Sequence, residues 1–261
     1  MELNIYGCRG SIPSSSPNTV RYGGNTSCYE ILVHNKQIIL DTGSGFRNLR
    51  LQPDRAKIIL YSHWHHDHIQ GLPFNGDLFM KENSVTICSA LATKRPFRNT
   101  LQTYFSGGYF PVDIVKHLPN LTFVNFNELQ KQLSPEVEVE WLELNHPGGA
   151  AGYSIKSFNG KISYLCDNEY EPSQFDELSQ FAKDSDIVIW DGMFTDAELP
   201  SKKGWGHSSI EQAIEFYNKC NIKKLLIAHH DPGRLDSELD ELSSTLPDGI
   251  EFAYDGMKVS V

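Results

Sequence analysis

Four residues with metal-binding side chains lie close together after a short apolar run of the sequence. The run at residues 57–61 is predicted to be a buried strand, because apolar side chains dominate it. The following segment, residues 62–68, contains the spacing H-x-H-x-D-H, formed by His63, His65, Asp67 and His68. Imidazole and carboxylate groups are the ligands that zinc and similar divalent metals prefer. Because a strand end holds the loop after it in place, the pattern predicts a metal site.

Three isolated polar residues, His146, Asp167 and His229, lie at or near the ends of further predicted strands. With the first cluster they give seven potential ligands, which suits two metal ions that share one carboxylate. The predicted sets are His63, His65 and His146 for one ion, Asp67, His68 and His229 for the other, and Asp167 between them. Two such ions would generate a bridging hydroxide and bind substrate oxygens. A chance histidine run in a surface turn would not explain the downstream partners.

The order of these residues resembles the metallo-β-lactamase superfamily over most of the chain. The matching elements are H-x-H-x-D-H, a lone histidine, an aspartate after a strand, and a late strand that ends in histidine. The resemblance implies an α/β fold, a four-layer αββα sandwich of two mixed β-sheets flanked by helices, with the metals at one edge of the sheets. It also favours His229 over the adjacent His230 as the ligand.

Two positions narrow the chemistry that the resemblance implies. Antibiotic-degrading members place cysteine or another non-bridging residue where this chain has Asp167. Oxygen-reducing members carry glutamate where this chain has His65. Members with a bridging aspartate hydrolyse phosphodiesters or thioesters. The resemblance therefore disfavours lactam hydrolysis and a di-iron redox site.

Three short segments resemble the branch that contains ribonuclease Z and cyclic-nucleotide phosphodiesterases. They are residues 7–13 (Gly-x-Arg-Gly-Ser-x-Pro), residues 41–45 (Asp-x-Gly-x-Gly) and residues 206–209 (Gly-His-Ser-Ser). The last segment implies that His207 contacts the scissile phosphate and assists the leaving oxygen; the alternative is an ordinary residue before a helix. We expect that helix to begin with a capping box of Ser208 and Glu211. We expect Asp67 to take a proton from the incoming water.

The connection between His146 and Asp167 and the net charge both favour a small substrate. Ribonuclease Z carries a long tRNA-clamping arm between these two ligands, whereas this chain has a predicted hairpin with its turn at Asn159-Gly160. The net charge of −10 repels a long polyanion unless a basic patch overrides it. The basic clusters are short: Lys94-Arg95 with Arg98, and Lys202-Lys203. We therefore expect a small nucleotide phosphodiester, such as a cyclic nucleotide, rather than long RNA or DNA.

The remaining features of the sequence suit a globular protein. We expect residues 1–261 to form a single hydrolase domain with an aromatic-rich excursion at about residues 93–118, which is a lid, a homodimer contact or a segment packed on the core. No apolar run reaches the length of a membrane span. The five scattered cysteines include no C-x-x-C pair, which suggests free thiols and a cytoplasmic location without a membrane partner.

These observations lead to one hypothesis and two alternatives. The hypothesis is a metal-dependent phosphodiesterase in which a hydroxide bridging two metal ions attacks phosphorus, with Asp67 and His207 as catalytic residues. Zinc is the default ion for these ligands, and manganese or iron are the alternatives. A thioester hydrolase of the glyoxalase II type would use the same metal set. A non-catalytic binding protein stabilised by metal is the other alternative.

Overall fold

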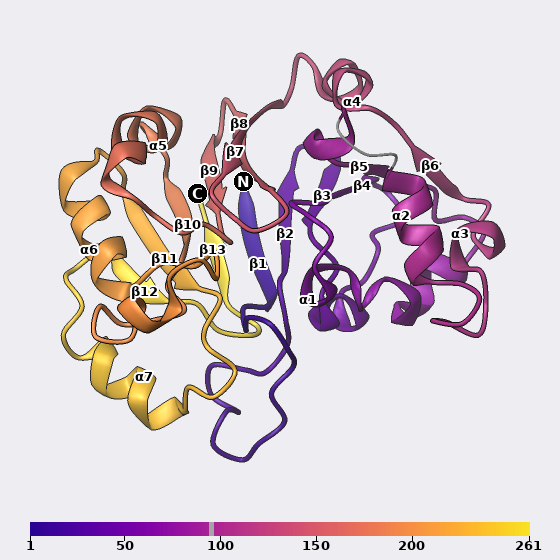
Figure 1. Ribbon diagram of the computed structural model, residues 1–261. Helices are drawn as coiled ribbons and strands as arrows, with labels where there is room; N and C mark the ends of the chain where they lie inside the picture. Colours follow the sequence, from indigo (N-terminus) through magenta and orange to yellow (C-terminus); the bar gives the residue numbers. More distant parts are fainter. Residues whose placement is uncertain (94–96) are drawn as a thin grey trace.

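The computed structural model describes residues 1–93 and 97–261, and Figure 1 shows its first sheet built mainly by the N-terminal half of the chain. Within these described ranges the sheet has seven strands, in the order β13-β1-β2-β3-β4-β5-β6. Their bounds are Glu2–Gly7 (β1), Cys28–Val33 (β2), Lys36–Leu40 (β3), Ala56–Leu60 (β4), Val85–Cys88 (β5), Leu121–Phe123 (β6) and Lys258–Ser260 (β13). Strands β13 to β3 pair antiparallel and β3 to β6 pair parallel, so the sheet is mixed.

The second sheet comes from the C-terminal half of the chain. Over the described residues it has six strands, in the order β12-β11-β10-β9-β8-β7. Their bounds are Glu138–Leu144 (β7), Ala150–Ser157 (β8), Gly160–Leu165 (β9), Ile187–Asp191 (β10), Lys224–Ala228 (β11) and Ile250–Phe252 (β12). This sheet is also mixed, because β7, β8 and β9 pair antiparallel whereas β9 to β12 pair parallel.

The helices lie outside the two sheets, which face each other in the middle of the molecule (Figure 1). Their bounds are His66–Ile69 (α1), Phe97–Tyr104 (α2), Ile114–His117 (α3), Phe126–Leu133 (α4), Phe175–Ala182 (α5), Ile210–Lys219 (α6) and Asp236–Ser243 (α7). Helices α5, α6 and α7 cover the second sheet, and α2 and α3 lie on the side of the first. This arrangement confirms the αββα sandwich of two mixed sheets that the sequence predicts.

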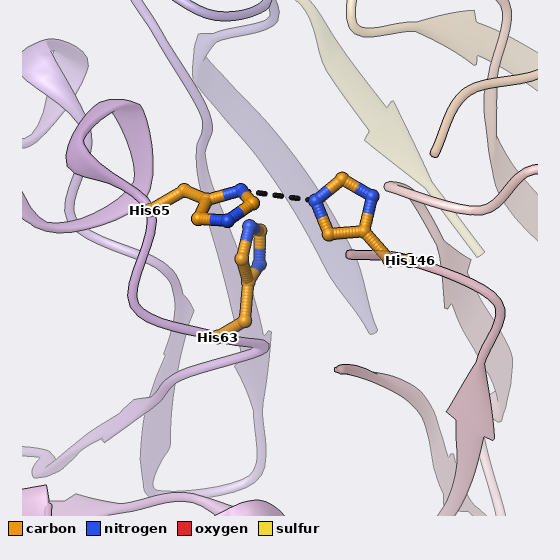
Figure 2. A group of neighbouring side chains, drawn as sticks. All are labelled: His63, His65 and His146. Atoms are coloured by element: carbon orange, nitrogen blue, oxygen red, sulfur yellow. Dashed lines mark hydrogen bonds between the residues drawn. The ribbon is translucent and has the colours of Figure 1, made fainter. Parts of the chain in front are cut away.

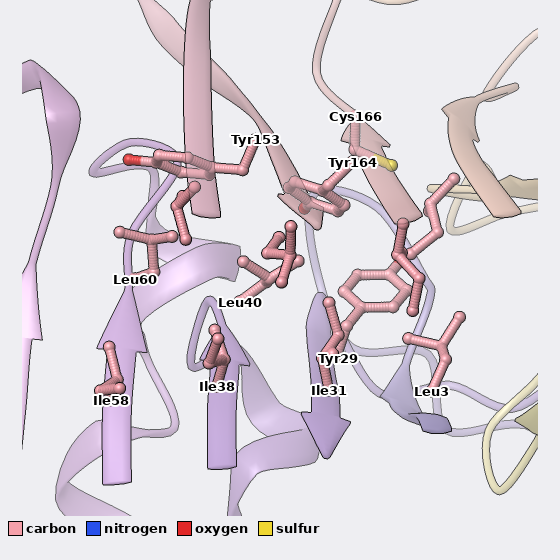
Figure 3. Packing of buried hydrophobic residues seen from close by; sticks show 14 of the residues in the cluster. Leu3, Tyr29, Ile31, Ile38, Leu40, Ile58, Leu60, Tyr153, Tyr164 and Cys166 are labelled. Atoms are coloured by element: carbon pink, nitrogen blue, oxygen red, sulfur yellow. The ribbon is translucent and has the colours of Figure 1, made fainter. Parts of the chain in front are cut away.

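The core between the sheets is apolar and fully buried (Figure 3). Side chains alternate along a strand, so every second residue of the central strands points inward, as Ile38 and Leu60 do from the first sheet. Tyr153 reaches across from β8, donating a hydrogen bond to the carbonyl of Tyr61 at 2.8 Å and accepting one from the amide of Ala90 at 2.9 Å. These bonds tie the second sheet to the end of β4, where the histidine-rich segment begins.

The excursion after β5 packs on the core through its apolar face. Phe97, Leu101 and Phe105 are buried against the outer face of the first sheet, whereas Tyr109 keeps 81% of its surface exposed. The start of the excursion, with the predicted basic pair Lys94-Arg95, lies outside the described residues.

Two local features differ from the sequence analysis. Helix α4 was not predicted, although it is capped by Asn125 with Glu128 and buries three apolar side chains. The predicted capping box of α6 is wrong by one residue, because Ser209 and Gln212 form it. Neighbouring serines give the same pattern in sequence, and only the backbone decides which serine caps the helix.

Candidate metal and phosphodiester site

Three histidines from two distant segments face one another at the edge of the sheets (Figure 2). His63 and His65 lie in the loop after β4, and His146 follows the end of β7. His65 Nδ1 and His146 Nε2 are 3.0 Å apart, and the ring centroid of His63 lies 4.4 Å from His65 and 4.8 Å from His146. The structure therefore brings together the first predicted ligand set.

The second predicted set also converges. His68 Nε2 lies 3.3 Å from Asp67 Oδ2, and His229 Nε2 lies 3.8 Å from the same oxygen. One ligand atom from each of these residues falls within 4.8 Å of the others. Asp67 and His68 come from helix α1, whereas His229 directly follows β11.

Asp167 lies between the two sets, and its carboxylate oxygens face different partners. Oδ2 is 3.7 Å from both His63 Nε2 and His146 Nε2. Oδ1 is 3.3 Å from His68 Nε2 and 3.4 Å from His229 Nδ1. This placement suits a carboxylate shared by two cations.

Several atoms in the site have no hydrogen-bond partner among the described residues. They are the Nε2 atoms of His63, His68 and His229 and the Oδ1 atom of Asp167, all buried. A buried polar atom without a partner is costly, so such atoms are rare unless a ligand satisfies them. Zinc binds imidazole at roughly 2.0–2.1 Å in tetrahedral geometry, which sets ligand atoms about 3.3 Å apart. The separations of 3.0–3.8 Å between these ligand atoms fit divalent metal ions.

Three site residues have left-handed backbone conformations. The φ angles are 59° for Asp41, 63° for Asp167 and 60° for His229. Asp41 and His229 directly follow β3 and β11, and Asp167 follows β9 with one residue between. At each point the chain turns out of the sheet. Residues other than glycine seldom adopt this conformation, and where they do so they cluster at functional sites. The turns bring these three side chains to the same site, where Asp41 and Asp167 contact His68 and Asp167 contacts His229.

Asp41 orients two of the histidines. Its Oδ2 accepts hydrogen bonds from His68 Nδ1 at 2.8 Å and from the Ser62 hydroxyl at 2.7 Å. Ser62 Oγ lies in turn 3.0 Å from His63 Nδ1, so it can accept that proton. With both Nδ1 atoms engaged, the Nε2 lone pairs of His63 and His68 point at the candidate metals. The sequence analysis missed this role, although the Asp-x-Gly-x-Gly turn after a strand marked the residue.

Burial and the carboxylates act in opposite directions on the histidines of the site. Burial lowers the pKa of His63, His65 and His229, whereas the carboxylates of Asp167, Asp67 and Asp41 outweigh burial and raise the pKa of His68. Burial opposes ionisation of Asp67 and Asp167, but the neighbouring histidines, His68 and His229, hold the pKa of both carboxyl groups below its usual range. Neutral imidazoles and ionised carboxylates are the forms that bind cations.

His207 lies beside the two ligand sets with its own acidic partner. Its ring stacks on that of His229 at 4.9 Å, and its Nδ1 donates a hydrogen bond to Asp191 at 2.8 Å. Burial lowers the pKa of His207, but the charge and hydrogen bond of Asp191 outweigh burial and raise it to about 9. This shift favours the protonated form of His207, and its Nε2 makes no hydrogen bond to the described residues.

The structure also shows the contacts of two further residues near the site, His230 and Arg9. His230 donates its Nε2 proton to the carbonyl of Ala253 at 2.8 Å, so it lies outside the ligand sets that contain His229. Arg9 is fully buried, and its guanidinium ties the loop after β1 to the loop after β11 by donating to the carbonyls of Gly23 and Asp231. Arg9 therefore acts as a loop anchor rather than a phosphate contact.

A model of the β-lactamase superfamily domain matches residues 36–230, which is most of the chain. The chain therefore belongs to this superfamily, as the order of its histidines and aspartates predicted. The matched segment contains both predicted ligand sets, Asp167 and His207.

Similar proteins indicate which branch of the superfamily the chain resembles. Ribonuclease Z of Clostridium kluyveri is 25% identical over 289 aligned positions, which cover 91% of this chain and 90% of that protein. The metallo-β-lactamase fold protein YhfI of Bacillus subtilis has a TM-score of 0.74 at 18% identity, covering 100% of this chain and 99% of its own. The short form of human tRNase Z has a TM-score of 0.69 at 19% identity, with coverage of 100% and 99%. These similarities support a metal-dependent hydrolase of the ribonuclease Z-like branch. In the part of the chain that the structure describes, no helix has the length and apolar character that a membrane crossing requires.

Proposed function

We propose that this protein hydrolyses small nucleotide phosphodiesters, such as cyclic nucleotides, with the help of two divalent metal ions. One observation carries the proposal: seven histidine and aspartate side chains converge, and several of their facing atoms have no other partner among the described residues. A protonated histidine, His207, lies directly beside them. Metal ligands next to a proton donor are the parts that phosphodiester hydrolysis needs.

The distances between these side chains support two ligand sets. His63, His65 and His146 would hold one cation, Asp67, His68 and His229 the other, and Asp167 would contact both. When bound, the cations would lower the pKa of a water and neutralise negative charge on the phosphoryl oxygens. Zinc is our first choice because five of the seven ligands are histidines, and manganese or iron are the alternatives.

The chain's own residues would move the protons. Asp67 is ionised, and its Oδ2 is held by the amide of Ser11 at 2.8 Å, so the carboxylate is placed to accept a proton from the attacking water. His207 would give its Nε2 proton to the departing ester oxygen, because Nδ1 is already bound to Asp191. Proton donation to an alkoxide leaving group is worth about 10²–10⁴-fold in rate.

Charge and chain length support a small substrate. The net charge is −10, and the connection from His146 to Asp167 contains only the β8–β9 hairpin. The alignment with the Clostridium kluyveri relative has 289 positions, more than the 261 residues of this chain, so that relative carries segments that this chain lacks. Because the relative is a ribonuclease Z, RNA is the competing substrate class.

A hydrolysis screen tests the proposal. Protein loaded with zinc or manganese would be given cyclic mononucleotides, cyclic dinucleotides, RNA 3′ trailers, bis(p-nitrophenyl) phosphate and S-lactoylglutathione. We expect turnover of a cyclic nucleotide and near-complete loss of activity in Asp67→Ala, whereas Asp248→Ala, which removes an exposed carboxylate, keeps it. Faster cleavage of RNA trailers would mean that the substrate is RNA rather than a small nucleotide. Faster cleavage of S-lactoylglutathione would mean that the reaction is thioester hydrolysis. Full metal occupancy without any hydrolysis would leave only a binding role.

A further inference from the structure

An exposed tryptophan lies on the loop that leads into His207. Trp205 is two residues before His207, in the connection between β10 and α6, and 57% of its surface is exposed. Trp190, in contrast, is 1% exposed in the core. A single exposed apolar side chain is ordinary on a protein surface, but the backbone around Trp205 is held firmly.

A carboxylate clamps the chain on both sides of Trp205. Glu169 Oε2 accepts hydrogen bonds from the amide of Gly204 at 2.8 Å and from the amide of Gly206 at 2.9 Å. Gly206 has a φ of 88°, and a Cβ there would lie 2.2 Å from His146 Nδ1. The Gly206 carbonyl in turn accepts the Nδ1 proton of His146 at 2.8 Å. The turn that presents Trp205 is thus fixed directly to the metal-binding edge.

The side chain of Phe194 links the ring of Trp205 to that of His207. Phe194 contacts both rings edge-on, with centroid distances of 6.4 Å to Trp205 and 6.1 Å to His207. Lys202 Nζ lies over the indole, 4.2 Å from its centroid. The loop therefore presents a rigid aromatic surface and a positive charge next to the proposed proton donor, on a protein whose overall charge is negative.

We propose that Trp205 and Lys202 form a nucleobase subsite, in which the base of the substrate stacks on the exposed part of the indole. This inference rests on the proposed phosphodiesterase function. Aromatic side chains bind bases by stacking with little preference among them, and a nearby cation strengthens the contact. The subsite would therefore select nucleotides over other phosphodiesters while accepting several bases.

Two substrates with the same leaving group isolate the base. Thymidine 5′-(p-nitrophenyl) phosphate carries a nucleoside, and methyl p-nitrophenyl phosphate does not. We expect Trp205→Leu to raise the KM for the thymidine ester, relative to the methyl ester, about ten-fold, in line with the strength of base stacking. Trp205→Phe should restore most of the difference. Phe158→Leu is the matched control, because Phe158 is 85% exposed and lies in the β8–β9 turn, at the opposite end of β9 from Asp167.

A binding measurement separates failure of the subsite from failure of the proposed function. Thymidine 5′-monophosphate should quench the tryptophan fluorescence of the zinc-loaded protein, and the quenching should be lost in Trp205→Phe. If neither ester is hydrolysed, the proposed function fails. If thymidine 5′-monophosphate quenches the fluorescence of Trp205→Phe as strongly as that of the wild type, the subsite is wrong as well. If both esters are hydrolysed but Trp205→Leu leaves the KM ratio unchanged, or weakens both equally, the subsite is wrong and the phosphodiesterase remains.

Discussion

His207 and Asp191 form a buried hydrogen-bonded pair, with 2.8 Å between Nδ1 and Oδ2. The carboxylate is fully buried and also accepts hydrogen bonds from the amides of Met193 and Asn168. These bonds fix the Asp191 side chain, which in turn fixes the ring of His207 and leaves its Nε2 free. The partner of Asp191 is therefore the proposed proton donor rather than a metal-ligating histidine.

The first prediction concerns the leaving group. His207→Ala should lower kcat about 10²–10⁴-fold on a cyclic nucleotide, whose ribose oxygen needs a proton to depart. The same variant should lose far less on bis(p-nitrophenyl) phosphate, because p-nitrophenolate leaves without protonation. Asp191→Asn should show the same selectivity with a smaller loss. Equal losses on both substrates would mean that His207 serves only to hold the site together.

The second prediction concerns Asp41, which touches no candidate metal position but orients His63 and His68. Asp41→Asn should weaken zinc binding about 10–100-fold, because hydrogen bonds behind metal-binding histidines contribute about that much. Chelator competition measures the affinity. Ser62→Ala should weaken binding less, since only the bond to His63 Nδ1 is lost, and Asp248→Ala should leave affinity unchanged. Wild-type affinity in Asp41→Asn would contradict the role given to this carboxylate.

The third prediction compares two buried tyrosines in the core between the sheets. Tyr153→Phe should lower the free energy of unfolding by about 1–3 kcal/mol, because the buried Ala90 amide then loses its partner. Tyr29→Phe should change it by less, since the Tyr29 hydroxyl has no hydrogen-bond partner among the described residues. Urea denaturation measures both. A larger loss for Tyr29→Phe than for Tyr153→Phe would contradict the packing described between the sheets.

The fourth prediction concerns the cysteines. Cys8, Cys28, Cys88 and Cys166 are buried free thiols, and Cys220 is half-buried. Burial raises the pKa of Cys220 to about 11, so little thiolate forms at neutral pH and the reaction is slow. A thiol reagent such as DTNB should label Cys220 slowly in the native protein and all five thiols after unfolding. Rapid labelling of more than one thiol in the native state would show that the core opens readily.

The sequence predicted the site best where a single histidine or aspartate follows an apolar strand. His146, Asp167 and His229 could be predicted as partners of the first histidine cluster because strand ends in such folds meet at one edge. Asp41 also follows a strand, but its partner could not be predicted from the sequence. Which histidine its carboxylate contacts depends on the packing of two strands and a helix. Glu169 gave no local signal at all, since it acts on the backbone of a loop more than thirty residues away.

Helix α4 and the cap of α6 show a different limit. Both have ordinary local signals, an Asn-x-x-Glu box for α4 and two adjacent serines before α6. The first was present in the sequence and not used. The second could not be resolved, because a shift of one residue in a cap changes no hydrophobic pattern and depends on the backbone angles alone.

Locating metal ions in crystals of zinc-loaded protein would test the central claim most directly. Anomalous diffraction at the zinc edge should show two peaks per chain, one among His63, His65 and His146 and the other among Asp67, His68 and His229, with Asp167 contacting both. Absence of zinc from this edge of the sheets, or a site formed by other residues, would contradict the account.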